Sequence, residues 1–91
     1  MYRLDISKSA QRFLNSLPQK QSSQLAEKIL LLSEDLDSIP SRALKWYFPY
    51  RRIASWEYRI IYRLDWDIIS ILLIWKRNDA SIYKIMRRKM R

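Results

Sequence analysis

The fold of this chain is decided by a stretch that runs Tyr58-Arg59-Ile60-Ile61-Tyr62-Arg63-Leu64, breaks at Asp65-Trp66-Asp67, and continues Ile68-Ile69-Ser70-Ile71-Leu72-Leu73-Ile74-Trp75. Two apolar runs rich in β-branched and aromatic residues, separated by turn-tolerant aspartates, predict a β-hairpin. The second run is apolar on both faces, which is typical of a central strand covered on both sides. In the first run side chains alternate, so Arg59, Ile61 and Arg63 share one face. The hairpin is therefore expected to hold two arginines on one surface of a sheet.

The composition indicates a single small domain, covering residues 1–91, with an anionic partner. A chain of this length lies at the small end of what one hydrophobic core can hold together. Eighteen Lys and Arg residues against nine Asp and Glu residues give a net charge of +9. Such an excess favours nucleic acid or an acidic protein as the partner, with a merely solvated basic surface as the alternative.

Cysteine, histidine and glycine are absent from the sequence. Without the first two, the chain has no disulfide framework and no thiolate or imidazole metal ligand, and its carboxylates are scattered, so we expect no metal or other cofactor. Without glycine, turns must use Asp, Asn, Ser and Pro, and tight positive-φ turns are not expected. No signal peptide or membrane-spanning run is present, which predicts a cytoplasmic protein without membrane contact.

Periodicity predicts the elements before the hairpin. Residues 2–6 alternate as a strand at or near a sheet edge, and Ser7 or Ser9 is expected to cap a helix through about Ser16. After Pro18, a second helix is expected over about 19–36. Its single buried stripe consists of Leu25, Ile29, Leu32 and Leu36.

The remaining segments complete an α+β pattern. Residues 43–49 are irregular and aromatic, and residues 50–54 form a strand that turns into the hairpin at 55–57. Asn78 or Asp79 can cap a last basic helix over about 80–88. We therefore predict an antiparallel-rich sheet of about four strands, with the N-terminal helical hairpin on one face and a short C-terminal basic helix.

The face of the sheet away from the helical hairpin is expected to be open and to carry Arg52, Arg59 and Arg63. Guanidinium groups pair bidentately with phosphate oxygens, so such a face is a phosphate-binding surface. Three aromatic residues precede it, Trp46, Tyr47 and Phe48. They are core or lid residues, a base-stacking surface, or part of a groove for a protein partner.

Three features form one pattern: the order of elements, the run Tyr58-Arg59-Ile60-Ile61-Tyr62, and Lys76-Arg77 followed six residues later by Tyr83. This pattern resembles the RelE/ParE superfamily of bacterial and archaeal toxins from toxin–antitoxin pairs, and the resemblance covers essentially the whole chain. RelE-like members cut mRNA in the ribosomal A site, whereas ParE-like members poison DNA gyrase. The arginine after the last strand and the C-terminal tyrosine, which gyrase poisons generally lack, favour the RelE-like branch.

RNA cleavage by attack of the 2′-OH on the adjacent phosphate requires three things. The hydroxyl must lose its proton, the charge on the phosphate must be stabilised, and the leaving oxygen must gain a proton. Because the chain has no histidine, only arginine, lysine and tyrosine remain for this chemistry. Arginine stays charged at physiological pH, so its role is to clamp the phosphate and stabilise its developing charge.

The resemblance implies a catalytic set of Arg59, Arg77, Tyr83 and Arg52. Arg59 would bind the phosphate, and Arg77 would stabilise the transition-state charge or protonate the leaving group. Tyr83 would orient or stack on the nucleotide, or transfer a proton. The family has lysines on the preceding strand, where this chain has Arg52, with Arg51 as the alternative. An arginine scarcely acts as a base, so the base is left open. Further RNA contacts are expected from Arg51, Arg63, Lys45, Lys76, Arg87 and Arg88.

The resemblance also implies partners. They would be the ribosome, mRNA, and a cognate antitoxin that is RelB-like or another acidic, partly disordered protein. Such an antitoxin would wrap the toxin and cover or displace the helix that carries Tyr83. Two alternatives to a ribosome-dependent endoribonuclease are a ParE-like gyrase poison and an inactive basic module that binds RNA or antitoxin.

Overall fold

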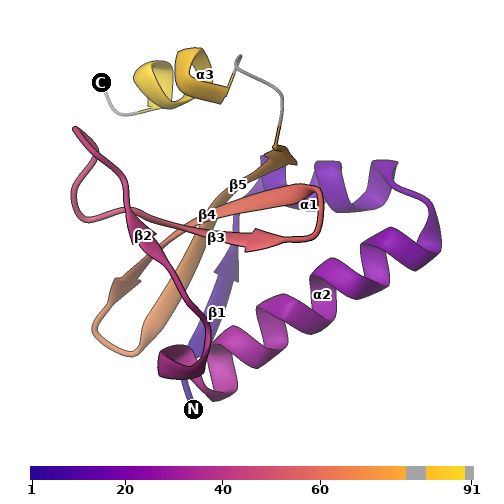
Figure 1. Ribbon diagram of the computed structural model, residues 1–91, viewed down its shortest axis with the longest axis horizontal. Helices are drawn as coiled ribbons and strands as arrows, with labels where there is room; N and C mark the ends of the chain where they lie inside the picture. The colour runs from indigo at the N-terminus through magenta and orange to yellow at the C-terminus, as the bar shows by residue number, and fades with distance from the viewer. Residues whose placement is uncertain (78–81, 90–91) are drawn as a thin grey trace.

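A five-stranded mixed sheet organises the molecule, and the computed structural model describes residues 1–77 and 82–89 (Figure 1). The strand order is β1-β5-β4-β3-β2; β1 is parallel to β5 and every other neighbouring pair is antiparallel. The elements in chain order are β1 (Arg3–Ile6), α1 (Lys8–Ser16), α2 (Gln19–Glu34), the 3-10 helix η1 (Leu36–Ser38), β2 (Arg42–Ala43), β3 (Arg51–Ser55), β4 (Tyr58–Asp65), β5 (Ile68–Lys76) and α3 (Ile82–Lys89). The predicted α+β architecture is confirmed.

The sheet has one more strand than predicted, the second helix ends earlier, and one prediction cannot be compared. The additional strand is β2 at residues 42–43, next to and partly within the segment 43–49 that we expected to be irregular. Helix α2 ends at Glu34, before the predicted end at about residue 36, because the backbone of Asp35 leaves the helical region. The N–H of Asp35 donates the last helical hydrogen bond, to the carbonyl of Leu31 at 2.8 Å. The predicted caps of the last helix, Asn78 and Asp79, lie outside the described residues.

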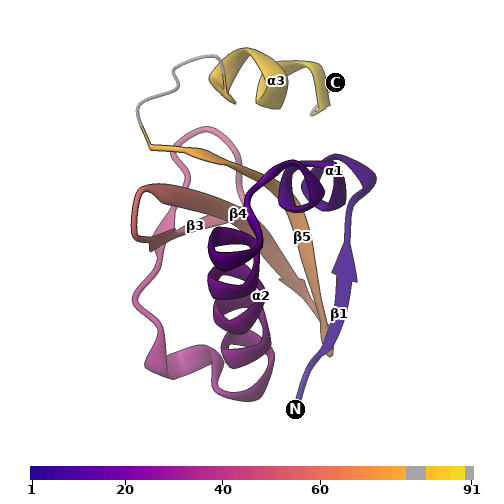
Figure 2. The same cartoon turned by 90° about the vertical axis from the view of Figure 1, so that its right-hand side faces the viewer.

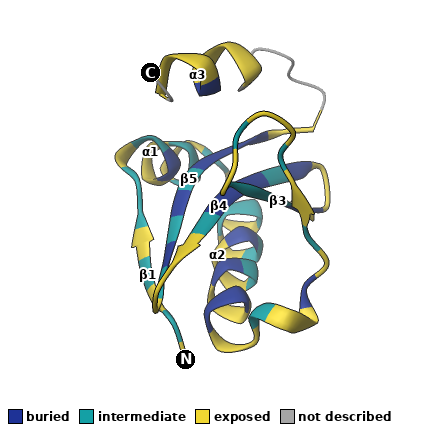
Figure 3. Cartoon of the chain, turned by 90° about the vertical axis from the view of Figure 1, so that its left-hand side faces the viewer, coloured by how far each residue is buried: buried dark blue, intermediate teal, exposed yellow. Residues whose placement is uncertain are grey.

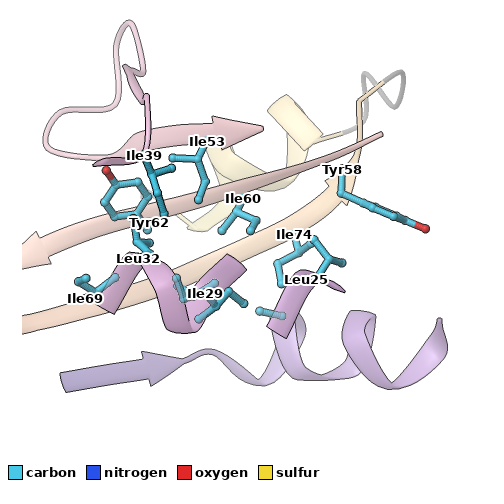
Figure 4. Close-up of a cluster of buried hydrophobic side chains, with 12 residues drawn as sticks. Leu25, Ile29, Leu32, Ile39, Ile53, Tyr58, Ile60, Tyr62, Ile69 and Ile74 are labelled. Atoms are coloured by element: carbon cyan, nitrogen blue, oxygen red, sulfur yellow. The ribbon is translucent and has the colours of Figure 1, made fainter. Parts of the chain in front are cut away.

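The first core lies between the sheet and the helices α1 and α2, which cover the same side (Figure 2). The predicted stripe of α2 is confirmed, since Leu25, Ile29 and Leu32 are buried and Leu36 packs beside them. Figure 4 shows Leu25, Ile29 and Leu32 of α2 facing the side chains of the strands. The strand residues buried in this core are Ile53, Tyr58, Ile60, Tyr62, Ile69, Ile71 and Ile74.

A bulge in β5 changes which of its residues face the first core, from Ile69 and Ile71 before it to Ile74 after it. Ile61 pairs with Leu73 but Tyr62 pairs with Ile71, so Leu72 is an extra residue. Its carbonyl accepts hydrogen bonds from Ser7 Oγ at 2.6 Å and from Ser9 Oγ at 3.4 Å. The hydroxyl of Ser7 also accepts from the N–H of Ala10 and thereby caps α1. One serine thus fixes the start of α1 and the bulge together.

Beyond the bulge, Leu73 and Trp75 face the opposite side of the sheet and form a second, smaller core with Ile61 and Met86. Met86 of α3 is 1% exposed, and the loop between β2 and β3 packs on the same cluster (Figure 3). The prediction that β5 is covered on both sides is therefore confirmed. The prediction of an open second face is wrong, because α3 and this loop cover part of it.

The expectation that a chain without glycine avoids positive-φ turns is also wrong. Trp46, Trp56 and Trp66 have φ values of 75°, 60° and 57°. Trp56 and Trp66 each begin the two-residue connection of a hairpin, where the right-handed twist of the strands favours positive φ. A left-handed conformation costs a residue with a Cβ about 1–2 kcal/mol, so hairpin geometry outweighs local preference at these sites.

Candidate nucleic-acid interface

Two open pockets adjoin each other along β2 and β3, on the side of the sheet that α3 partly covers. Their volumes are about 500 Å³ and about 400 Å³. Arg42 and Arg52 line both pockets, so the two form one continuous surface that we call the basic groove. Its charged and aromatic lining residues are Arg42, Lys45, Trp46, Tyr47, Arg52, Arg59, Tyr83 and Arg87.

The register of the sheet places three arginines in the basic groove. Arg42 of β2 lies directly opposite Arg52 of β3. On the other side of β3, Ala54 lies opposite Arg59 of β4, and both residues line the smaller pocket. Side chains at opposite positions of antiparallel strands have Cβ atoms about 4.5–5.5 Å apart, and like charges placed there are destabilising. The pairing of Arg42 with Arg52 therefore creates a local positive potential that an anion would relieve.

The guanidinium of Arg59 is held by backbone carbonyls at the β3–β4 turn. Its Nη1 donates to the carbonyl of Tyr58 at 3.0 Å and to that of Trp56 at 3.3 Å. Within residues 1–77 and 82–89, the two ion pairs are Arg3–Asp67 and Arg63–Asp65. No carboxylate in that part of the chain therefore neutralises Arg59, Arg42 or Arg52.

Helix α3 brings Tyr83 and Arg87 to the larger pocket. Met86 anchors the helix in the second core, while Tyr83 is 48% exposed. Tyr83 and Arg87 are four residues apart, one turn of helix, so both lie on the same side of α3. The structure therefore brings the predicted residues Arg52, Arg59 and Tyr83 to one groove, together with Lys45 and Arg87.

Five other predicted residues lie outside the lining of both pockets, and three of them, Lys76, Arg77 and Arg88, are exposed. Arg77 follows β5 directly, and its N–H donates to the carbonyl of Glu57 at 2.7 Å, which ties it to the β3–β4 turn. Arg77 thus lies at the same end of the sheet as the turn that holds Arg59.

Arg51 and Arg63 have structural partners, and neither arginine lines the basic groove. Arg51 faces the opposite side of β3, where its Nε donates to Ser41 Oγ at 2.8 Å. Arg63 Nη2 contacts Asp65 Oδ2 at 2.9 Å, and its guanidinium carbon lies 5.8 Å from the ring centroid of Tyr50. The hydrogen bond to Asp65 raises the pKa of the Arg63 guanidinium above its ordinary value. Of the two candidates on β3, only Arg52 is therefore positioned in the groove.

Arg42 was not predicted as a site residue from the sequence, although it lines both pockets. The residue stands in a two-residue strand, and nothing in its local pattern distinguishes it from other surface arginines. Its place in the groove comes from pairing with β3, which is a non-local event. Periodicity within one segment cannot reveal such pairing.

The described residues show two further absences. Across 1–77 and 82–89, no three acidic side chains gather to hold a metal ion. No helix in these same ranges is long and apolar enough to cross a membrane.

The sequence and the fold place the chain among the toxins of type II toxin–antitoxin systems. Residues 4–80 match the family model described as "ParE toxin of type II toxin-antitoxin system, parDE". This match spans most of the chain, so the chain belongs to the RelE/ParE superfamily. No curated protein sequence matches it significantly.

Solved structures confirm that the fold is RelE-like. A free E. coli RelE toxin carrying two arginine-to-alanine mutations has a TM-score of 0.75 and 18% identity, covering 99% of this chain and 98% of that one. The Mycobacterium tuberculosis toxin–antitoxin complex RelBE2 has a TM-score of 0.73 and 22% identity, and the match covers 84% of this chain and 98% of that one. The archaeal RelE–RelB complex from Pyrococcus horikoshii has a TM-score of 0.63 and 24% identity, and the match covers 87% of this chain and 98% of that one.

Proposed function

We propose that this toxin is a ribosome-dependent mRNA endoribonuclease that acts in the cytoplasm, without a metal, by attack of the 2′-OH on the adjacent phosphate. The observation that carries the proposal is the convergence of Arg42, Arg52 and Arg59 in one groove, beside Tyr83. Three guanidinium groups with no carboxylate partner among the described residues match a polyanionic backbone. The aromatic residues at the α3 end match its unpaired bases.

Three groove residues and the neighbouring Arg77 have roles in this proposal. Arg59 and Arg52 clamp the scissile phosphate and stabilise its developing charge. The guanidinium of Arg59 is already held by the carbonyls of Tyr58 and Trp56 before substrate binds. Tyr83 orients the nucleotide from α3. Arg77, at the neighbouring end of the sheet, stabilises the leaving oxygen. Arginine is a poor base, so no groove arginine is assigned to remove the 2′-OH proton. The ribosome contributes by holding the 2′-OH in line with the phosphate.

A gyrase poison is the second candidate, because the matching family model is described as a ParE toxin. Inducing the chain in cells separates the two functions if mRNA 5′ ends and DNA supercoiling are measured in parallel. RNA cleavage predicts in-frame cuts within translated regions and unchanged supercoiling. Double-strand breaks without such cuts would instead establish gyrase as the target. Arg77→Ala is informative here: we expect it to abolish cutting, and full toxicity of this variant would favour gyrase.

We further propose that an acidic antitoxin neutralises the toxin by wrapping it. Two of the similar toxins were solved as toxin–antitoxin complexes, RelBE2 and RelE–RelB. The net charge of +9 favours an acidic, disordered segment that folds on binding. Co-expression with the neighbouring gene should yield a complex that binds no RNA. Recovery of the toxin alone from such cells would contradict this proposal.

A further inference from the structure

We infer that Trp46, on the loop between β2 and β3, is a stacking platform for an unpaired RNA base next to the phosphate held by the basic groove. This inference rests on the proposed function and deepens it, because it names a base-binding subsite. The subsite is the larger pocket, which Trp46 shares with Lys45, Arg52, Tyr83 and Arg87.

The loop that carries Trp46 is closed by its own hydrogen bonds. The N–H of Leu44 donates to the carbonyl of Tyr50 at 3.0 Å, and that of Tyr50 to the carbonyl of Tyr47 at 2.8 Å. The N–H of Tyr47 donates back to the carbonyl of Leu44 at 3.2 Å. The side chains of these three residues pack against the second core. The loop is therefore anchored on its inner side, and Trp46 is 85% exposed on an ordered support.

The conformation of Trp46 has two unfavourable features. Its φ of 75° lies in the left-handed region, and its large apolar ring faces solvent. Strained residues of this kind gather at functional sites. Trp56 and Trp66 share both features but line neither pocket of the basic groove. The position of Trp46, rather than its strain alone, therefore points to a ligand.

The chemistry around Trp46 selects a nucleic-acid base as that ligand. Lys45 Nζ lies 5.4 Å from the centroid of the Trp46 ring. A cation on one side of an indole leaves the other face available for stacking. The residues described in the lining of the larger pocket include four cations and no carboxylate. This charge favours a polyanion over an apolar peptide that carries no acidic residues. The pocket volume of about 500 Å³ lies within the usual range for small-molecule sites and accommodates a nucleobase.

The pocket also places this base relative to the phosphate. Arg42 and Arg52 line the boundary between the two pockets of the basic groove. A backbone bound at these arginines can direct one phosphate towards Arg59 and the neighbouring base towards Trp46. Stacking tolerates every base because each has a π-face, so the subsite supplies affinity and position rather than strict sequence selection.

The test measures binding of a fluorescein-labelled RNA hexanucleotide whose 2′-OH groups are replaced by hydrogen, so that it cannot be cleaved. A matched series carries one abasic nucleotide at each position in turn. We expect one abasic position to weaken binding to the wild-type toxin about tenfold, the usual effect of losing one stacked base. Trp46→Ala should lose the same factor on the intact oligonucleotide and should no longer detect that abasic position. Trp46→Phe should retain most of the affinity.

Trp66→Ala is the matched control, because Trp66 is 91% exposed with φ of 57° but lies outside the basic groove. It should bind the whole series like the wild type. Wild-type binding by Trp46→Ala would overturn the inference, as would a loss of antitoxin affinity without a loss of RNA affinity. These measurements need no cleavage or ribosome. An absence of mRNA cutting in cells would therefore reject the proposed function, whereas an unchanged abasic series would reject the subsite alone.

Discussion

At the scale of single residues, the proposed function depends on which arginines line the basic groove. Arg63 is paired with Asp65 and Arg51 is bound to Ser41, so both are occupied in the fold. Arg42, Arg52 and Arg59 meet in the basic groove instead. More arginines were predicted for the site than the groove contains, and the pairing of strands decides which of them line it.

Arg42 provides a test of this view, because only the structure assigns it to the groove. We expect Arg42→Ala to reduce RNA affinity and to lower the salt slope of binding by about 0.7, the change for one phosphate contact on a single strand. Folding should be unaffected or slightly improved, since the substitution removes a like-charge pair with Arg52. The measurement is RNA binding across a salt series. Arg3→Ala, at the other edge of the sheet, is the control and should keep the wild-type slope.

Tyr58 gives a pH dependence of stability. It is 5% exposed and packs edge-on against Phe13, with ring centroids 5.8 Å apart. Burial, followed by the nearby charge of Glu57, raises the pKa of the Tyr58 phenol above its ordinary value. The stability from this group is therefore fully present below the unfolded-state pKa of about 10, and is lost as pH rises towards the higher folded-state pKa.

We accordingly expect the free energy of unfolding to fall above about pH 10, and to fall less in Tyr58→Phe. Urea titrations on both sides of that pH measure the difference. Tyr83→Phe, at a half-exposed position, serves as the comparison. An equal alkaline loss in wild type and Tyr58→Phe would show that Tyr58 does not cause it.

At the scale of elements, Met86 anchors α3 in the second core. We expect Met86→Ala to weaken this docking, because truncating a buried methionine costs about 2–5 kcal/mol. Helix α3 should then be cut faster by trypsin at its basic residues, and RNA affinity should fall because Tyr83 and Arg87 leave the pocket. The first core, on the other face, should stay intact by circular dichroism. Ile85→Ala, at an exposed position of the same helix, should change neither property.

The elements also show what could be predicted from the sequence. The hairpin of β4 and β5 and the stripe of α2 were predictable, because consecutive strands pair and a helix has one apolar face. The bulge at Leu72 was not, since a run that is apolar on both faces conceals a change of register. Strand β2 was missed because its pairing is non-local. The left-handed tryptophans contradict local preference, and the hairpin geometry that imposes them at Trp56 and Trp66 is not visible in composition.

The candidate site was predictable to a similar extent. Arg52, Arg59 and Tyr83 were expected together and line the same groove. Arg77 lies at the neighbouring turn, and Arg51 lies on the opposite face of β3. Alternation along a strand distinguishes Arg51 from Arg52 only once the face of that strand is known. That knowledge came from the register with β4.

At the scale of the whole molecule, a net charge of +9 should make RNA binding strongly dependent on salt. Contacts from three groove arginines alone give a slope of about −2 in log K against log salt for single-stranded RNA. Other basic residues near the groove, including Lys45 and Arg87, would make the slope steeper. Fluorescence anisotropy over a range of salt concentrations measures it, and an affinity independent of salt would contradict the electrostatic account.

The central claim is that the basic groove cleaves translated mRNA. The most direct test is primer extension on purified ribosomes that have bound an mRNA and whose A site is empty. The wild-type toxin should produce new mRNA 5′ ends within the A-site codon, and none on the same mRNA without ribosomes. Arg59→Ala should cut about a hundredfold more slowly, since loss of one fixed charge from such a site costs about 3 kcal/mol. An mRNA left intact by the wild-type toxin, or cut equally fast by Arg59→Ala, would contradict the account.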